Sequence, residues 1–364
     1  MRTILALLPW VLAIALLVIC LLEPRSTPWI LLGVAVLICW FRHSFWPERG
    51  LIGPLQIPAQ DAFLPNEQVQ WWYWNGHLQT EDGRRFGFEI VLFGFHDFHR
   101  IPVMHDQLVQ AAITDVDGDS YAFEEFVEFV LPDRTKNGFN LSSGKDNKVT
   151  ASGGGGSDHL HSEVGNYVLD LDLKSDTVAR HCGGGARPYA VGGYTYYYSR
   201  PRMQASGTLG IGGKSYKVTG TAWFDRQFGE IYNAISQGWQ WFAIELEDNR
   251  QIMIYDFNGK DAHLGTGSIT DALGRTSDLA AHQFNITVLD HWTSPATKCT
   301  YPSGWEVTVE GQKFNIQPLV KNQELRGRHK FWIGPVYWEG ACSVSGDVGG
   351  KAYVELNGYC RECP

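Results

Sequence analysis

Residues 67–98 read EQVQWWYWNGHLQTEDGRRFGFEIVLFGFHDF, and this stretch decides the fold. Four large aromatic residues stand together at 71–74, and Asp82-Gly83 marks a tight turn between two strand-like runs. A hairpin with so many bulky rings is typical of a sheet that curls around an apolar interior. The stretch therefore predicts an aromatic β-hairpin that begins a barrel.

The aromatic hairpin recurs later in the chain. The segment 239–250 repeats the segment 72–84 about 167 residues further on, with a short gap in the turn. The segment 206–220 also returns as 345–358, because both carry Ser-Gly, then Gly-Gly-Lys, then a closing Gly. An offset shared by an aromatic strand and a closing hairpin indicates two diverged copies of one all-β unit.

Length and composition agree with two β domains. The chain has 364 residues, and removal of a hydrophobic N-terminus leaves two units of roughly 150 residues, each large enough for its own core. Forty glycines and an aromatic share of 13% favour turns and strands over helices. We expect a membrane anchor at 1–49, an N-terminal domain at 50–221 and a C-terminal domain at 222–364.

The charge and the histidines exclude two classes of partner. A formal net charge of −9 and a pI near 5.7 argue against a nucleic-acid surface, which needs a basic stripe. His96, His99 and His105 lie close enough in sequence to suggest zinc, but their intervals suit a polar loop, and no Cys or acidic residue has matching spacing. We therefore expect no nucleic-acid partner, no metal and no cofactor.

The N-terminal 49 residues carry two hydrophobic runs. Ile4–Leu22 is uncharged and would span roughly 28 Å as a helix, which just crosses a bilayer. Trp29–Phe41 is shorter, so a tilted span, a re-entrant piece and an interfacial helix stay open. A cleaved signal peptide is the alternative to this anchor. Two crossings would place the main domains in the cytoplasm, which we favour, and one crossing would place them outside.

The cysteines do not fix the compartment. Cys20 and Cys39 fall in the hydrophobic runs, and five further cysteines remain. Cys360 and Cys363 resemble half a zinc knuckle or a redox pair, but no second pair and no βαβ context accompanies them. We expect an incidental pair in the C-terminal tail.

Short alternating runs separated by turn residues fill the body of the chain. Residues 108–114 and 120–123 flank an acidic turn and predict a hairpin. Residues 167–173 alternate strictly, as a half-buried strand does. Residues 136–158 include four consecutive glycines and are expected to form a flexible loop.

Five motifs in a fixed order point to a known family. They are the aromatic block at 71–74, the run 110–118, the segment 193–229, the block 238–242 and the segment 338–359. Together they resemble the carotenoid 1,2-hydratase (hydroxyneurosporene synthase) family, also called AttH-like, over roughly residues 55–360. The resemblance implies two tandem lipocalin-like β-barrels with a ligand cavity between or within them. It also implies hydration of terminal double bonds in polyenes, or cyclisation of polyene chains as in fungal relatives.

The chain departs from the family pattern at several polar positions. Gln70 stands where the family usually has Glu, Gln110 stands where a His is typical, and Arg226-Gln227-Phe228 replaces His-Glu-Trp. Asp225 keeps its acid. Hydration of an alkene needs a proton donor, and a carboxyl in an apolar pocket can stay protonated at neutral pH. The replacements retain hydrogen-bond donors, which suits positioning and polarisation of a substrate.

The candidate catalytic residues are Asp225, Arg226, Gln227 and His77. A simple ion pair between Asp225 and Arg226 is the structural alternative, and His77 is either a donor in the cavity or a residue that bonds the backbone. Aromatic faces can stabilise a cation. Neighbours on a strand point to opposite faces, so the residues at 71 and 73 share one face and those at 72 and 74 the other, and the sequence leaves open which pair lines the cavity. The expected substrate-binding residues are Gln70, Trp72, Trp74, Tyr196, Tyr198, Trp223, Trp239, Trp241, Tyr255 and Trp338.

The sequence thus predicts a membrane-anchored, all-β enzyme with two tandem lipocalin-like barrels. Its expected partners are the membrane and a long apolar small molecule such as a polyene or an isoprenoid. A protein that binds or carries such a lipid without chemistry is the alternative, because barrels of this size often hold one ligand. The oligomeric state is left open.

Overall fold

The computed structural model describes Gly33 and residues 53–96, 104–189, 192–235, 238–257, 265–327 and 336–360. Apart from Gly33, the hydrophobic runs Ile4–Leu22 and Trp29–Phe41 lie outside these residues, as do His99 and Cys363. Within the described part of the chain, no helix is both long enough and apolar enough to cross a membrane.

The first sheet forms a nearly closed barrel. Its strands follow the order β4-β3-β2-β1-β12-β11-β8-β7-β6-β5, and the short strands β9 and β10 pair with β11. All of its pairs are antiparallel, so hairpins connect most neighbours. The elements are η2 (Ala59–Asp61), β1 (Val69–Thr80), β2 (Arg85–Phe95), β3 (His105–Asp115), β4 (Ser120–Val130), β5 (Phe139–Ser143), β6 (Val149–Gly154), β7 (Ser157–Val164), β8 (Tyr167–Lys174), β9 (Ala179–Arg180), η3 (His181–Gly184), β10 (Arg187–Pro188), β11 (Tyr194–Ile211) and β12 (Lys214–Glu230).

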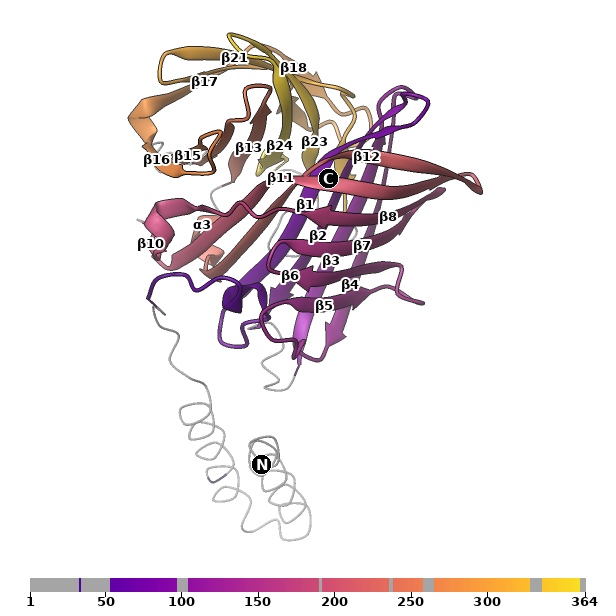
Figure 1. Ribbon diagram of the computed structural model, residues 1–364, viewed down its shortest axis with the longest axis vertical. Coiled ribbons are helices and arrows are strands. Elements are labelled where there is room, and N and C mark those ends of the chain that lie inside the picture. The colour runs from indigo at the N-terminus through magenta and orange to yellow at the C-terminus, as the bar shows by residue number, and fades with distance from the viewer. Residues whose placement is uncertain are drawn as a thin grey trace. The chain divides into compact units, whose positions relative to one another are not determined.

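The second sheet has the corresponding order of strands. Its later strands are the orange and yellow ones in Figure 1. It runs β16-β15-β14-β13-β24-β23-β21-β20-β17, with β22 beside β23, and β18 pairs with β19 separately. The all-β prediction of two related barrels is confirmed. The elements are α3 (Tyr232–Ile235), β13 (Trp239–Leu246), β14 (Gln251–Phe257), β15 (Thr266–Thr270), β16 (Thr276–Ala280), η4 (Ala281–Gln283), β17 (Phe284–Val288), β18 (His291–Thr293), β19 (Thr300–Pro302), β20 (Trp305–Val309), β21 (Gln312–Pro318), β22 (Glu324–Arg326), β23 (Val336–Gly346) and β24 (Gly350–Asn357).

The first sheet ends and the second begins downstream of the domain boundary that we expected between residues 221 and 222. That division falls inside β12, which pairs with β1 as far as Gly229. The second sheet begins at Trp239. The first barrel therefore closes with the whole of β12, whose last residues carry the motif around Asp225.

Each barrel has its own core, and a third apolar layer lies between them. Trp72 and Trp74 pack inside the first barrel, and Phe242 and Ile244 pack inside the second. The opposite faces of the same strands meet in a layer that includes Tyr73, Tyr197, Trp223, Trp241 and Tyr353. Burying side chains of this size contributes roughly 1.5–3 kcal/mol each, so the layer holds the barrels together.

Hydrogen bonds also fasten one barrel to the other. Thr114 Oγ1 of β3 donates to Gln323 Oε1 at 2.8 Å. The Tyr337 hydroxyl of β23 donates to Gln110 Oε1 at 2.7 Å. Both bonds join β3 of the first barrel to the neighbouring segments at Gln323 and β23 of the second barrel, which helps to fix how the two faces meet.

The two barrels repeat the same topology, but the offset of 167 residues does not align equivalent side chains. An offset of 167 residues pairs Trp72 with Trp239, yet Trp72 lies in the core of the first barrel and Trp239 lies in the layer between barrels. A shift by an odd number of residues reverses every side chain in a strand. The side chains that face the space between the barrels are Trp71 and Tyr73 in β1 and the equivalent Trp239 and Trp241 in β13.

The expected flexible loop at 136–158 is instead part of the first sheet. Strands β5 and β6 and the start of β7 occupy it. The glycines are needed for close packing of backbone rather than for flexibility. Gly156 has a φ of +89°, and a Cβ there would lie 2.0 Å from the carbonyl oxygen of Ser175.

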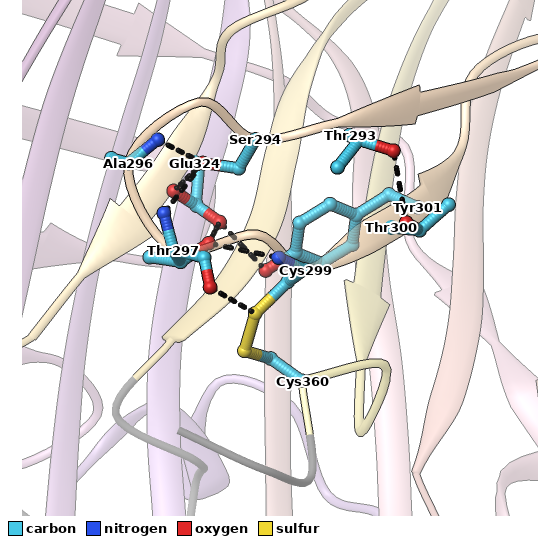
Figure 2. Close-up of a disulfide and its surroundings, with 9 residues drawn as sticks. All are labelled: Thr293, Ser294, Ala296, Thr297, Cys299, Thr300, Tyr301, Glu324 and Cys360. Atoms are coloured by element: carbon cyan, nitrogen blue, oxygen red, sulfur yellow. Dashed lines mark hydrogen bonds between the residues drawn. A yellow bond between two sulfur atoms is a disulfide. The ribbon is translucent and has the colours of Figure 1, made fainter. Parts of the chain in front are cut away.

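A disulfide joins Cys360, at the end of the chain's described part, to Cys299 before β19 (Figure 2). Their Cα atoms are 5.2 Å apart, within the usual range for a disulfide. The loop around Cys299 is further held by Glu324, whose carboxylate accepts bonds of 2.6 Å from both Ser294 Oγ and Thr297 Oγ1. Cys360 thus pairs across the second barrel, which corrects the expectation of an incidental tail pair.

Replacing Cys299 by Ser is expected to lower the free energy of unfolding by about 2–4 kcal/mol, because the disulfide closes a long loop in the unfolded chain. Urea denaturation without reductant measures this. A reductant should lower the wild-type midpoint and leave that of Cys299→Ser unchanged. A wild-type midpoint that does not respond to reductant would contradict the assignment.

Candidate functional site

A small cavity of about 40 Å³, called the chamber below, lies between the two barrels. Its volume is well below the ~300–1,000 Å³ typical of small-molecule sites. The first barrel contributes residues from β1, β2, β11 and β12, and the second contributes residues from β13, β14, β23 and β24. The lining consists of Trp71, Tyr73, Val91, Phe93, Tyr197, Asp225, Gln227, Trp239, Trp241, Tyr255, Tyr337, Glu339 and Glu355.

Strand alternation explains why these residues line the inter-barrel chamber. Every lining residue has an odd number, and successive side chains of a strand point to opposite faces of its sheet. The even-numbered neighbours fill the barrel interiors. The pair that lines the chamber from β1 is therefore Trp71 with Tyr73, which settles the choice that the sequence left open.

Asp225 is a buried acid of the chamber wall with three hydrogen-bond donors around it. It is 3% exposed and accepts hydrogen bonds of 2.6 Å from the Tyr197 hydroxyl and from Trp223 Nε1. The Ser199 hydroxyl donates a third bond. Burial raises the pKa of Asp225 to about 7, although the bonds from Ser199, Tyr197 and Trp223 act in the opposite direction. This carboxyl can therefore hold or release a proton near neutral pH.

A chain of hydrogen bonds connects Asp225 to the second barrel. His181 Nε2 lies 2.6 Å from Ser199 Oγ, and His181 Nδ1 lies 2.9 Å from Ser268 Oγ. Burial lowers the pKa of His181 to about 3, so its ring is neutral. Since the Ser199 hydroxyl proton goes to Asp225, His181 Nε2–H donates to Ser199 and Nδ1 accepts from Ser268. The chain fixes the orientation of Asp225.

The sequence analysis missed three buried acids near the chamber, namely Glu339 and Glu355 of the second barrel and Glu89 of β2 in the first. Glu339 accepts a bond from the Tyr73 hydroxyl, and burial together with the charge of Glu89 raises its pKa well above the ordinary value. Burial raises the pKa of Glu89 to about 8. Burial, followed by the charge of Glu339, also raises the pKa of Glu355 well above normal. Burial therefore favours the neutral, protonated form of all three carboxyls.

A signal for these acids was present in the strand pattern. Glu339 and Glu355 alternate with bulky residues such as Trp338 and Leu356, so each had to lie on the face opposite a barrel core. Among the described residues, no group of three or more His, Cys, Asp or Glu is arranged to hold a metal ion.

Several predicted site residues do meet at the chamber. Asp225, Gln227, Trp239, Trp241 and Tyr255 line it. Trp223 stands directly behind Asp225 and donates to it. Gln227 donates to Thr195 Oγ1 at 2.8 Å, which holds its side-chain amide in place.

Other predicted site residues lie in the barrel interiors and do not line the chamber. Trp72, Trp74, Tyr196 and Tyr198 belong to the core of the first barrel. Trp338 belongs to the core of the second barrel. Each sits one residue away from a lining position, and a step of one residue moves a side chain to the other face of its sheet.

Arg226 and Gln70 also point into the first barrel. The Arg226 guanidinium lies 4.0 Å from the Trp72 ring centroid and donates to Ala62 O at 2.8 Å and to Gln70 Oε1 at 2.9 Å. Burial lowers the pKa of Arg226 to about 10. Because Asp225 faces the chamber and Arg226 faces the core, the alternative of an ion pair between them does not apply, and each residue has its own hydrogen-bond network.

The sequence allowed two roles for His77, a donor in the cavity or a bond to the backbone. The structure shows the bond to the backbone. His77 Nε2 lies 3.0 Å from the carbonyl oxygen of Ala352 in the second barrel. Burial lowers the pKa of His77 to about 4, so the ring is neutral. His77 joins the two barrels and does not line the chamber.

Comparisons with known proteins agree with this architecture. The family model described as AttH-like matches residues 51–359. A crystal structure of an AttH protein from Nitrosomonas europaea is similar with a TM-score of 0.75 and 27% identity, over 85% of this chain and 98% of that chain. Kievitone hydratase from Nectria haematococca has a TM-score of 0.65 and 18% identity, over 84% of this chain and 93% of that chain. No match was found among curated proteins.

The likeness to kievitone hydratase establishes the shared lipocalin-like fold, and the match of the family model goes further because it spans both barrels and the chamber. The resemblance that the motifs indicated is confirmed at the level of the family. The chain belongs to the AttH-like family.

Proposed function

We propose that the inter-barrel chamber hydrates a carbon–carbon double bond at the end of an apolar chain, such as a polyene or an isoprenoid. The observation that carries the proposal is Asp225, a buried acid with a pKa of about 7 on the wall of an aromatic chamber. Such a group is protonated often enough to donate, and its conjugate base is stabilised by three hydrogen bonds.

The proposed reaction needs only water besides the substrate. Asp225 transfers its proton to one carbon of the double bond, and the other carbon becomes a carbocation. Water adds to this carbon and gives its proton to the Asp225 carboxylate, so the product is an alcohol and the acid is restored. The faces of Trp239 and Trp241 offer the negative side of their quadrupoles to the cation.

The protonated acids of the second barrel suit the handling of water. Glu355 faces the chamber from β24, opposite Trp241 of β13 in the strand pairing. A neutral carboxyl both donates and accepts hydrogen bonds, so Glu355 can hold a water molecule without adding a charge.

The placement of Arg226 and Gln70 favours hydration over cyclisation of a polyene. Positioning a polyene and polarising its carbonyl would require hydrogen-bond donors in the chamber. Arg226 and Gln70 instead use their donors inside the first barrel. Of the predicted polarising donors, Gln227 alone lines the chamber, whereas Asp225 is placed for proton transfer.

The comparisons support the same proposal. Kievitone hydratase is named for a hydration and shares this fold. The family model covers both barrels. The chemistry itself rests on the residues of this chamber, since one scaffold can host several reactions.

Replacing Asp225 by Asn is expected to abolish hydration and to leave ligand uptake nearly unchanged, because the amide keeps the shape of the side chain but has no acidic proton. The purified protein is incubated with candidate polyenes and isoprenoids, and mass spectrometry detects the gain of one water. The matched control is Asp158→Asn. Asp158 is a buried acid whose pKa burial raises to about 6, but it bonds Trp74 inside the first barrel.

Three outcomes are informative. Hydration by the wild type and Asp158→Asn but not by Asp225→Asn supports the assignment. Turnover that persists in Asp225→Asn would show that another group is the proton donor. Ligand that the wild type retains unchanged would favour the alternative of a lipid-binding protein.

We propose further that the hydrophobic N-terminal runs anchor the barrels at a membrane, where an apolar substrate dissolves. The cytoplasmic side favoured by loop charges stays a prediction. The Cys299–Cys360 disulfide supports the single-crossing arrangement instead, because disulfides persist in oxidising compartments.

Thiol trapping during denaturing lysis of intact cells separates the two sides. On the oxidising side, Cys299 and Cys360 are expected to remain linked and protected, while Cys182 and Cys342 are alkylated as internal controls. Alkylation of all four cysteines would place the barrels in a reducing compartment.

A further inference from the structure

A surface groove at one end of the first barrel joins two segments that lie far apart in the sequence. One is the segment 53–66, called the entry segment below, which precedes β1. The other is the loop 131–138 between β4 and β5. The residues that line the groove include Ala59, Phe63 and Pro65 of the entry segment and Pro132, Arg134 and Lys136 of the loop. The two segments therefore lie side by side.

Buried polar bonds fix the entry segment to the first barrel. Asp61 forms an ion pair of 2.7 Å with Arg200, and both side chains are buried. Arg226 donates to two backbone carbonyls of the segment, at 3.0 and 2.8 Å. The Gln70 side chain exchanges bonds of 2.9 and 2.8 Å with the backbone of Leu64. Two of the residues that depart from the family pattern, Gln70 and Arg226, thus hold this segment in place.

This attachment keeps the groove close to the proposed membrane anchor. The eleven residues 42–52 separate the second hydrophobic run, which ends at Phe41, from the start of the entry segment at Gly53. A chain of that length spans at most about 40 Å. Because the entry segment is bonded to the barrel at fixed points, the groove stays within that reach of a bilayer that holds the hydrophobic runs.

The exposed charges of the groove are positive, although the chain has a formal net charge of −9. Arg134 and Lys136 are exposed, and neither forms an ion pair with the described residues. The Asp133 carboxylate accepts backbone bonds of 3.0 Å within the loop and 2.8 Å from β5, which directs it inward. The one charged residue of the entry segment, Asp61, is buried against Arg200. The two cations are therefore available to an anionic partner.

Two exposed apolar side chains stand beside these cations. Leu131 is 68% exposed, and Phe129, near the end of β4, is 37% exposed. The other large apolar side chains that are exposed in the described part of the chain lie singly, at Val168, Leu273 and Leu289. Apolar side chains next to unpaired cations are typical of a surface that contacts lipid headgroups, because one group enters the interface while the other meets phosphate.

We propose that this end of the first barrel lies on a bilayer that contains anionic lipids. Leu131 enters the headgroup region, and Arg134 and Lys136 meet the lipid phosphates. The inference rests on the proposed anchoring by the N-terminal runs and not on the proposed hydration. It adds an orientation, since a connection of eleven residues alone lets the barrels turn freely, whereas a second contact determines which end faces the lipid.

Hydrogen exchange of the full-length protein tests this contact. The protein is reconstituted into vesicles of phosphatidylcholine with and without phosphatidylglycerol. We expect the amides of the loop 131–137 to exchange about tenfold more slowly on the anionic vesicles, and high salt should remove the difference. The turn 271–275 is the internal control, because it carries the exposed Leu273 but its Arg275 is already paired with Asp271. Its exchange should be the same on both vesicles.

Reversal of both charges, Arg134→Glu with Lys136→Glu, is expected to abolish the slower exchange of the loop. The matched control is Lys214→Glu with Lys217→Glu, which changes the net charge equally. These two exposed lysines lie on the β11–β12 hairpin, at the end of the first barrel opposite the groove. This control should keep the slower exchange. Circular dichroism verifies that each variant is folded.

An alkaline wash of the vesicles reports the anchoring separately. Protein that is retained but shows equal exchange of the loop on both vesicles would overturn this inference and leave the anchor intact. Slower exchange that survives the charge reversal would also overturn it. Release of the protein by the wash would remove the anchoring together with this inference, whereas the hydration assay is independent of both.

Discussion

Removal of carboxyl groups from water at the contact between two barrels is the constraint on which the rest of the site depends. Asp225 belongs to the first barrel, and Glu339 and Glu355 belong to the second, so none of them would be deeply buried on an isolated sheet face. Docking of the aromatic faces excludes water, and exclusion of water raises the pKa of each carboxyl. The acid strength of the site is thus a property of the packing.

Duplication of the fold places acids at equivalent points of the two barrels. In the first barrel, Asp225 of β12 stands opposite Tyr73 of β1, and in the second, Glu355 of β24 stands opposite Trp241 of β13. Different neighbours then act on the pKa values of these two acids. Three hydrogen bonds to Asp225 oppose the rise that burial causes in its pKa, whereas the charge of Glu339 adds to the rise that burial causes in the pKa of Glu355. Two related carboxyls therefore acquire different strengths, which is how one site can both donate a proton and hold water.

The sequence predicted the class of fold and the family, because the aromatic hairpin and the glycine pattern are local signals that recur in each copy. Of the residues that it predicted for the site, Asp225, Trp239 and Trp241 line the chamber. Trp72 and Trp74 lie in the core of the first barrel, which the sequence could not show, because alternation tells which residues share a face but not which face meets the second barrel.

The remaining features depend on contacts between distant segments. Glu339 became a site residue only when β23 met β1, since its partner Tyr73 is far away in the chain. The pairing of Cys299 with Cys360 likewise follows from the closure of the second barrel. Composition predicts a flexible loop at 136–158 because it does not distinguish a glycine that bends freely from one that lets two backbone segments approach closely.

Infrared titration of protonated carboxyl groups tests the central claim most directly. In the folded protein, the carbonyl stretch of protonated carboxyls should be present at neutral pH, and part of it should disappear as pH rises through about 7, where Asp225 ionises. Asp225→Asn should remove that part and leave the part that Glu89 contributes, which titrates near pH 8. A folded protein with no protonated carboxyl signal at neutral pH would contradict the account.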